Sequence, residues 1–386
     1  MSDNIPFELQ MEIITRVSDL KSLVRLRSVS KPWKSFIDSS DFISGYGARH
    51  TQPHHSLLLR YIDSFEGKMK YICFVDDDND TFTQQQDFAP TLPMLVKELT
   101  GDSCVVGSSY GLWCFYMKKE SKREMIVLWN PSIRKSIGIL LPNHVQTGHV
   151  FGFAVCPVTT DPTIVKIMYP WKVEIFTLSS KRWTMTPCSN LPRNSIRFRQ
   201  PSHVIGRCIY WVAYEVITTM GVSCIYYMIV SLDLVAKEFR VVDVPNNLTI
   251  RFLESKLFIS KLRESLVLFV PRNGGNIPAC AVWKMEHDGS FTKLFTFNTP
   301  DKEISNVLGF RKNGKPVMEI QWQGQGEHFG IYRDNSALGV YEQCSEHIND
   351  LGIYGIEDTF FMTFYKESLL LLDHSDGCVY PNEGAA

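Results

Sequence analysis

The chain has 386 residues, with 40 Lys and Arg against 41 Asp and Glu, so its formal net charge is −1. This balance excludes the basic excess typical of proteins that bind nucleic acids, and a hydrophobic fraction of 44% excludes a disordered chain. At ~100–200 residues per domain, the length allows two or three domains, or one large all-β domain with an appendage. The sequence shows no secretory signal and no apolar run of about 18 residues that could span a bilayer. We therefore expect a cytosolic or nuclear protein with reduced cysteines and no membrane or nucleic-acid partner.

The first segment, from residue 5 to about residue 42, has the apolar spacing of three short helices. Pro6 suits the first turn of the first helix, where its missing N–H is not needed. Asp19 and Ser30 are expected to cap the second and third helices, and Pro32 suits the first turn of the third. A unit this small rarely stabilises itself without a disulfide, a metal or a partner. Its surplus apolar surface therefore predicts an interface.

The order of residues in this helical segment follows a known pattern. The matching positions are Ile5, Pro6, Leu9, 12–14, 16–17, 21–23, 27–31, Trp33, Ile37 and Phe42. In order and spacing these residues resemble an F-box. Residues 17–20 depart from the family, because they read Val-Ser-Asp-Leu where Leu-Pro-Val is usual, which adds one residue and removes a proline. The alternative left open is a helical cap packed on its own domain.

The F-box resemblance implies a protein partner. It implies docking onto the Skp-family adaptor, and through it onto the cullin, of an SCF (Skp–cullin–F-box) ubiquitin ligase. Burial of apolar surface, at roughly 25 cal/mol per Å², would drive this contact. The sequence does not decide which apolar residues face the adaptor and which hold the helices together. The residues expected at the contact are Ile5, Pro6, Leu9, Ile13, Ile14, Val17, Leu23, Leu26, Trp33 and Ile37.

From residue 50 onward the pattern is that of β-strands. A short helical turn is expected only near residues 93–99. Polar turn clusters bound alternating or fully apolar runs, as expected for strands. The clearest predicted strands are 56–61, 125–129, 173–176, 227–230 and 266–270.

A coarse repeat of strand, polar turn and strand runs through this region. Its turn markers are spaced by 48, 55, 53, 48 and 39 residues. A four-stranded propeller blade takes roughly 40–50 residues, whereas a β-sandwich domain takes ~100, so the spacing predicts a β-propeller of about six to eight blades. We expect a mainly β protein with a three-helix F-box in residues 1–48 and the propeller in residues 49–386. The markers are Asn130, Leu178, Asp233, Glu286, Asp334 and Asp373.

The β region also carries a family resemblance, from about residue 100 to the C-terminus. The motifs are residues 106–112, 128–135, 151–153, 157–161, 165–167, 173–178 with Trp183, 209–211 and 229–240. Together they resemble the plant F-box-associated interaction domain, of the kelch-like propeller type. Cys156 stands where that family often has Tyr, and no Asp precedes Pro157. The resemblance implies recognition of a target protein.

Catalytic and metal-binding motifs are weak. Residues 107–111 match G-x-S-x-G, but a nucleophile elbow needs a following helix, and residues 112–116 read as a strand. Residues 76–80 place acids as in a calcium loop, but Thr81 stands where such a loop needs Gly, so a solvated hairpin tip is expected. The ten His and ten Cys show no zinc spacing, and residues 324–326 do not begin a dinucleotide loop. We expect no catalytic residue, metal or cofactor.

The resulting hypothesis is a non-catalytic substrate receptor of an SCF ubiquitin ligase. The propeller would bind a target protein, which the ligase would ubiquitinate for proteasomal degradation. Two alternatives remain: a non-ligase F-box scaffold or lectin-like propeller that binds a glycoprotein, and a propeller hydrolase or oxidase. The sequence does not identify the target or the residues that bind it.

Overall fold

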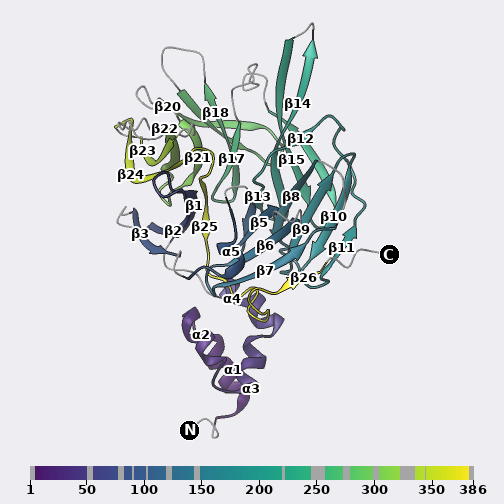
Figure 1. Ribbon diagram of the computed structural model, residues 1–386, viewed down its shortest axis with the longest axis vertical. Helices are drawn as coiled ribbons and strands as arrows, with labels where there is room; N and C mark the ends of the chain where they lie inside the picture. The colour runs from purple at the N-terminus through teal and green to yellow at the C-terminus, as the bar shows by residue number, and fades with distance from the viewer. Residues whose placement is uncertain are drawn as a thin grey trace.

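The computed structural model has a small helical head below a large β domain (Figure 1). Among the described residues, no helix has the length and apolar character needed to cross a membrane. The structure describes residues 5–49, 55–76, 82–88, 91–100, 103–118, 124–142, 148–219, 222–244, 257–272, 279–298, 304–321, 335–343 and 345–381.

The head, residues 5–49, contains α1 (Phe7–Thr15), α2 (Leu20–Leu26), α3 (Lys31–Ile37) and α4 (Ser40–Arg49). The first three helices were predicted and the fourth was not. Gly45 and Gly47 lie inside α4, and glycine weakens the helical signal of a sequence. Tertiary packing overrides that weakness, because α4 buries Phe42, Ile43 and Tyr46. The predicted domain boundary between residues 48 and 49 falls inside this helix.

Both predicted helix caps, Asp19 and Ser30, are confirmed. The Asp19 carboxylate accepts a hydrogen bond from the Ser22 backbone N–H at 2.8 Å. Ser30 caps α3 in the same way, and Pro32 lies in its first turn. The prediction for Pro6 was wrong by one position, since Pro6 precedes α1 as its N-cap residue with ψ at 143°.

The described strands form six sheets, so the predicted β-propeller is confirmed with six blades. The first blade is β1 (His55–Ile62), β2 (Met69–Asp76) and β3 (Phe82–Asp87), with β25 (Phe361–Tyr365) beside β1; the second is β4 (Cys104–Ser109), β5 (Leu112–Lys118), β6 (Glu124–Asn130) and β7 (Lys135–Leu140), with β26 (Val379–Tyr380) beside β7. The third is β8 (His149–Val155), β9 (Pro162–Met168), β10 (Lys172–Thr177) and β11 (Arg182–Met185); the fourth is β12 (Arg197–Phe198), β13 (His203–Ile205), β14 (Cys208–Thr219), β15 (Val222–Asp233) and β16 (Glu238–Asp243). The fifth is β17 (Phe258–Leu262), β18 (Ser265–Arg272), β19 (Ala279–Met285) and β20 (Phe291–Asn298); the sixth is β21 (Ile304–Phe310), β22 (Pro316–Gln321), β23 (Asn335–Glu342) and β24 (His347–Ile356).

The ring of blades is closed by strands from opposite ends of the chain. β25 pairs antiparallel with β1, with Thr363 opposite Leu58. The innermost strands β4 and β8, β17 and β21, and β21 and β25 contact one another around the axis. The five predicted strands all lie inside observed ones, and the predicted turn at residues 93–99 is α5 (Met94–Lys97).

The turn markers of the repeat have three different outcomes. Asn130, Leu178, Asp233 and Glu286 lie where the chain turns from β6 to β7, from β10 to β11, from β15 to β16 and from β19 to β20, each time within one blade. Asp334 lies outside the described residues. The prediction that the last marker, Asp373, lies in a further repeat was wrong. Asp373 lies between β25 and β26, in a segment that forms no blade hairpin, because β25 has already closed the ring.

Aromatic residues anchor the blades. Trp113, Trp129 and Trp211 are buried, and the indole N–H of Trp211 donates to the Phe151 carbonyl at 2.9 Å. Gly152 makes room for this contact, because a Cβ there would lie 2.3 Å from the Trp211 ring. Aromatic burial of this kind dominates the energetics of a core.

Two motifs from the sequence have clear structural outcomes. Residues 107–111 form a strand and a tight turn, with φ of 50° at Tyr110 and 79° at Gly111, and β5 follows directly. The prediction of a solvated hairpin tip was wrong for Asp76. This residue is buried and accepts a hydrogen bond from Arg311 Nη2 at 2.8 Å. A buried carboxylate requires such a partner. Residues 77–81 of the same motif lie outside the described part of the chain.

Candidate functional site

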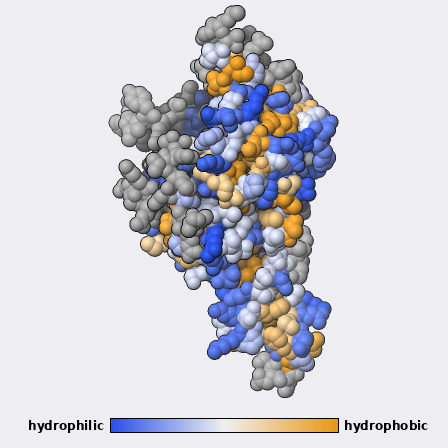
Figure 2. Space-filling view, turned by 90° about the vertical axis from the view of Figure 1, so that its right-hand side faces the viewer, coloured by the Kyte–Doolittle hydropathy of each residue, from blue (hydrophilic) through white to orange (hydrophobic). Residues whose placement is uncertain are grey.

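The α1 helix lies in the part of the head remote from the propeller (Figure 1), and apolar side chains on it and directly before it are exposed. Ile5, Leu9 and Ile13 are 42%, 51% and 55% exposed, and Pro6 is also exposed. Residues four apart lie on one face of a helix, so Leu9 and Ile13 share a face of α1, and Ile5 and Pro6 directly precede the helix. These exposed apolar residues are called the α1 stripe. Apolar side chains gather on the head in the space-filling view (Figure 2). An unpartnered apolar surface on so small a unit is typical of a docking site.

The other predicted contact residues are buried or partly buried. Ile14, Leu23 and Ile37 are at most 1% exposed and belong to the core of the head. They hold the helices together and offer no surface to a partner in this structure. Val17, Leu26 and Trp33 are partly buried against the same core.

Trp33 connects two helices of the head. Its indole N–H donates to Gln10 Oε1 at 2.6 Å, which joins α3 to α1. Its role in this structure is therefore to position the exposed stripe.

The sequence did not select two further exposed residues. Phe7 on α1 is 38% exposed and Val29, after α2, is 59% exposed. The sequence shows only that these two residues are apolar. Apolar residues occur at buried and at exposed positions of a short helix, so this character alone could not identify them. We add both to the candidate docking surface.

The core of the head is completed by the far end of the chain. The C-terminal strap, residues 366–381, follows β25, and its Leu369 and Leu372 are each 1% exposed. Both belong to the same buried cluster as Phe42 and Tyr46 of α4. The head therefore does not have an independent core, because it shares its buried surface with the strap.

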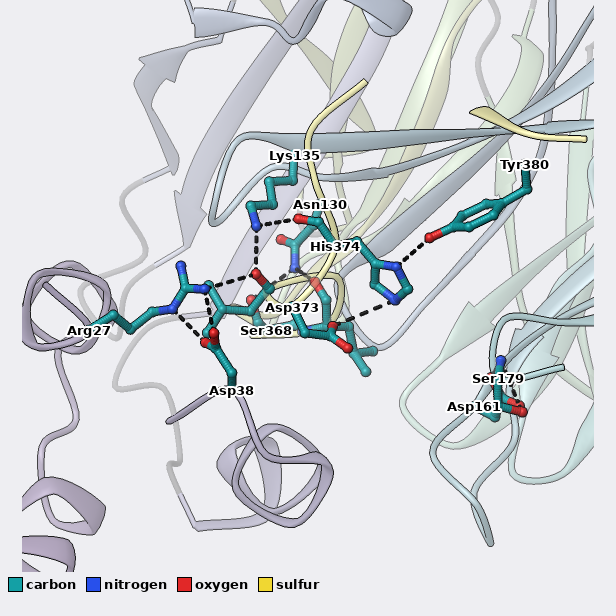
Figure 3. A network of polar contacts seen from close by, with 12 residues as sticks. Arg27, Asp38, Asn130, Lys135, Asp161, Ser179, Ser368, Asp373, His374 and Tyr380 are labelled. Carbon is teal, nitrogen blue, oxygen red and sulfur yellow. Dashed lines mark hydrogen bonds and ion pairs between the residues drawn. The ribbon is translucent and has the colours of Figure 1, made fainter. Parts of the chain in front are cut away.

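Polar contacts fix the strap between the head and the propeller (Figure 3). Arg27 donates to both carboxylate oxygens of Asp38, at 2.5 and 2.8 Å, and to the Leu372 carbonyl at 3.3 Å. Lys135 of β7 donates to the carbonyls of Leu372 and His374, each at 2.5 Å. The Leu372 carbonyl thus accepts from one cation of the head and one of the propeller.

Asn130 holds the first part of the strap. Its side-chain amide donates to the carbonyls of Ser368 at 2.9 Å and Leu370 at 2.7 Å. Its carbonyl oxygen accepts from the Ser132 N–H at 2.9 Å, which fixes the side chain in place. The turn at residues 130–132 therefore binds the strap through hydrogen bonds of Asn130.

The end of the strap lies against β7. β26 pairs parallel with this strand, with Val379 opposite Gly138. The His374 ring lies 2.6 Å from the Tyr380 hydroxyl, between Nδ1 and the oxygen. These contacts fasten both ends of the strap to the second blade.

The contacts of the strap with the head and with the second blade form a joint between them. Burial shifts the pKa values of two groups at this joint. Burial lowers the pKa of Lys135, and the nearby charge of Arg27 lowers it further. Burial also raises the pKa of Tyr46 to about 12. The Tyr46 hydroxyl therefore stays protonated and donates to the Ser18 carbonyl at 2.9 Å.

The centre of the propeller contains two cavities, of about 370 and 450 Å³. His203 of β13 lines both, and desolvation lowers its pKa to about 4, so the ring is neutral at physiological pH. Within the described part of the chain, no three His, Cys, Asp or Glu side chains are grouped as metal ligands.

Comparison with known proteins addresses the helical head first. A family model described as the F-box domain matches residues 2–44. The chain carries an F-box domain. The exposed stripe of α1 and the joint with the strap are thus features of an F-box attached to a six-bladed propeller.

Curated relatives from Arabidopsis thaliana are similar along the chain, and all are named as F-box proteins. One is 25% identical over 248 residues, which are 64% of this chain and 62% of the relative, so the chain matches less than two thirds of that protein. A second is 26% identical, with 80% of this chain and 74% of the relative covered. The F-box protein CPR1 is 25% identical, with 81% and 79% covered.

Solved structures have only distant likeness to this chain. The SapL1 lectin in complex with alpha methyl fucoside has a TM-score of 0.38 and 9% identity, with 79% of this chain and 97% of that chain covered. YCF48 bound to D1 peptide has a TM-score of 0.36 and 9% identity, with 82% and 96% covered.

Proposed function

We propose that this F-box protein is the substrate-recognition subunit of an SCF ubiquitin ligase. The exposed stripe carries the proposal, because Leu9 and Ile13 on α1 and Ile5 directly before it leave large apolar side chains in solvent at the tip of the F-box. A Skp-family adaptor would cover this stripe and would connect the chain to a cullin. Burying each Leu or Ile side chain would contribute about 1.5–3 kcal/mol.

The propeller would bind the target protein in the cytosol or nucleus. It supplies no bond chemistry in this proposal, because ubiquitin transfer would take place on other subunits. The joint supports this division of roles, since the strap ties the F-box to the second blade through Arg27, Lys135 and Asn130. A fixed joint would hold a bound target at one distance from the adaptor.

Affinity capture of the full chain from plant cells tests this proposal. We expect a Skp-family adaptor and a cullin to be recovered with the wild-type chain, and neither with the Leu9→Asp, Ile13→Asp double variant. Absence of the adaptor from the wild-type sample would contradict the proposal.

Proximity labelling with the same two chains separates a ligase receptor from a non-ligase scaffold. Proteins labelled by both chains should be short-lived only in cells that carry the wild type, and proteasome inhibition should remove the difference. Labelled proteins whose lifetimes are equal with both chains would favour the scaffold.

A further inference from the structure

One stretch of the propeller combines several basic residues with a complete lack of acidic ones. Between Glu174 and Glu215 the sequence contains no Asp or Glu, although the whole chain is balanced at 40 basic and 41 acidic residues. The same stretch carries six basic residues. They are Lys181, Arg182, Arg193, Arg197, Arg199 and Arg207.

Two of these arginines are neutralised at the ends of the fourth blade. Arg193 pairs with Glu215 at 2.8 Å, and Arg207 pairs with Asp233 at 2.6 Å. These contacts use carboxylates of β14 and β15. They leave the charge of the segment between them uncompensated.

Arg197 and Arg199 face aromatic rings. The Arg197 guanidinium lies 4.5 Å from the centre of the Tyr169 ring. The Arg199 guanidinium lies 5.3 and 5.4 Å from the rings of Tyr214 and Tyr227. Within the described part of the chain, neither arginine takes part in an ion pair. Arg197 Nη1 donates to the backbone carbonyls of Asn194 and Ile196, at 2.5 and 3.1 Å. A guanidinium stacked by its face keeps its other N–H groups at its edge for a carboxylate.

Arg199 lines a cavity of the propeller, and β12, which directly precedes it in the chain, lies away from the F-box (Figure 1). β12, which contains Arg197, lies in the half of the propeller remote from the head (Figure 1). Arg199 and Gln200 line the cavity of about 450 Å³, and Gln200 donates to the Phe151 carbonyl at 2.7 Å. Asp358 is the one acidic residue among the described lining residues, and its backbone N–H donates to Glu319 at 2.9 Å.

An exposed apolar hairpin belongs to the same blade. β14 and β15 pair along their full length of 12 residues. Val216, Ile217 and Tyr226 near its tip are 50%, 42% and 42% exposed. The hairpin rises above the other strands on the side remote from the head (Figure 1). Apolar and basic groups are thus available together at this end of the blade.

We propose that Arg197, Arg199 and the adjoining cavity mouth bind an extended acidic segment of a target protein. Two residues of extended chain span about 7 Å, so Arg197 and Arg199 match acidic side chains at alternate positions of a bound strand. The stacked tyrosines restrict both guanidinium groups before binding, which lowers the entropy lost on contact. The proposal rests on the proposed function only in that the bound segment would belong to a ligase target.

Fluorescence anisotropy with the full chain tests the acidic-segment site. The probe is a fluorescein-labelled peptide of alternating Glu and Ala, compared with the alternating Lys and Ala peptide. We expect binding of the Glu peptide alone, weakening as salt is raised. Each Arg→Ala change at 197 or 199 should weaken it by about tenfold or more, as expected for loss of a charged hydrogen bond.

Matched variants keep the test decisive. Arg182→Ala removes an exposed arginine of β11, in the third blade, and should leave the affinity unchanged. Arg199→Lys keeps the charge but loses the planar fork, so it should weaken binding less than Arg199→Ala. Adaptor binding measured on the same samples reports on the F-box independently of this site.

Several outcomes would overturn the proposal. They are equal binding of the Lys peptide, no binding of the Glu peptide by the wild type, or an Arg197→Ala, Arg199→Ala double variant with wild-type affinity and melting temperature. Displacement of the Glu peptide by a single-stranded oligonucleotide at equal concentration would indicate a nucleic-acid site instead.

Discussion

Exposure separates two kinds of apolar residue that look alike in the sequence of α1. Ile13 and Ile14 are neighbours, yet Ile13 is 55% exposed and Ile14 is 1% exposed. Helical periodicity predicted the helix, but α1 is apolar on more than one face, so periodicity could not show which face is covered. Only the packing of α2, α3 and the strap reveals that Leu9 and Ile13 lack a partner within the described chain.

A buried carboxyl group makes the stability of the propeller depend on pH. Glu319 in β22 is 0% exposed, and burial raises its pKa from 4.5 to about 8. The folded protein therefore keeps a proton that the unfolded chain releases above pH 4.5. The contribution of this group to the free energy of unfolding falls as pH rises from 4.5 to about 8.

Glu319→Gln removes this titration. We expect the melting temperature of the variant, relative to that of the wild type, to increase as the pH rises across this window. The wild type loses the contribution of the protonated carboxyl group, whereas the amide does not titrate. Thermal unfolding of both proteins through the window measures the effect. Parallel curves would show that Glu319 ionises in the folded state as it does in the unfolded chain.

Among the elements, the C-terminal strap is the one the sequence described least well. Its residues 371–377 fit the strand-and-turn pattern of the repeat, and so they suggested another blade. In the structure they form turns that fill the space between the F-box and the second blade. A local pattern cannot show that β25 has already closed the ring, because closure depends on a pairing between the two ends of the chain.

The strap should be required for adaptor binding even though it lies beside the propeller. Leu372→Asp places a charge in the shared core of the F-box, where Leu372 is 1% exposed. A buried unpaired charge is strongly destabilising, so we expect disordering of α4 and loss of adaptor affinity. Hydrogen exchange of residues 7–49 and adaptor titration measure the two effects.

Leu372→Met is the matched control for this prediction. It conserves volume and apolar character, and a swap of this kind usually costs less than about 1.5 kcal/mol. Adaptor binding should survive in this variant. Wild-type adaptor affinity in Leu372→Asp would show that the F-box folds without the strap.

On the scale of the whole molecule, ring closure links the first and last strands of the propeller. The period of the turn markers predicted the architecture, because Asn130, Leu178, Asp233 and Glu286 each mark a blade. The sequence did not reveal how the ring closes or how the F-box is attached. Both depend on contacts between residues more than 200 positions apart, such as Arg27 with Leu372 and Asn130 with Ser368.

Met362 of β25 tests the closure. Its side chain is 4% exposed and packs between the first and sixth blades. Met362→Ala should destabilise the propeller by about 2–5 kcal/mol, with faster hydrogen exchange in both β1 and β21. Met362→Leu, which conserves volume, should have a much smaller effect. Faster exchange confined to β25 would indicate that its closure does not stabilise the ring.

The most direct test of the central claim is the affinity of the purified full chain for a Skp-family adaptor, measured by calorimetry. Leu9→Asp with Ile13→Asp removes two apolar contacts of about 1.5–3 kcal/mol each, so we expect at least about 100-fold weaker binding. Val158→Asp changes a propeller residue that is 74% exposed and should leave the affinity unchanged. Equal affinity of the wild type and the Leu9, Ile13 double variant would contradict the assignment of the α1 stripe as the adaptor contact.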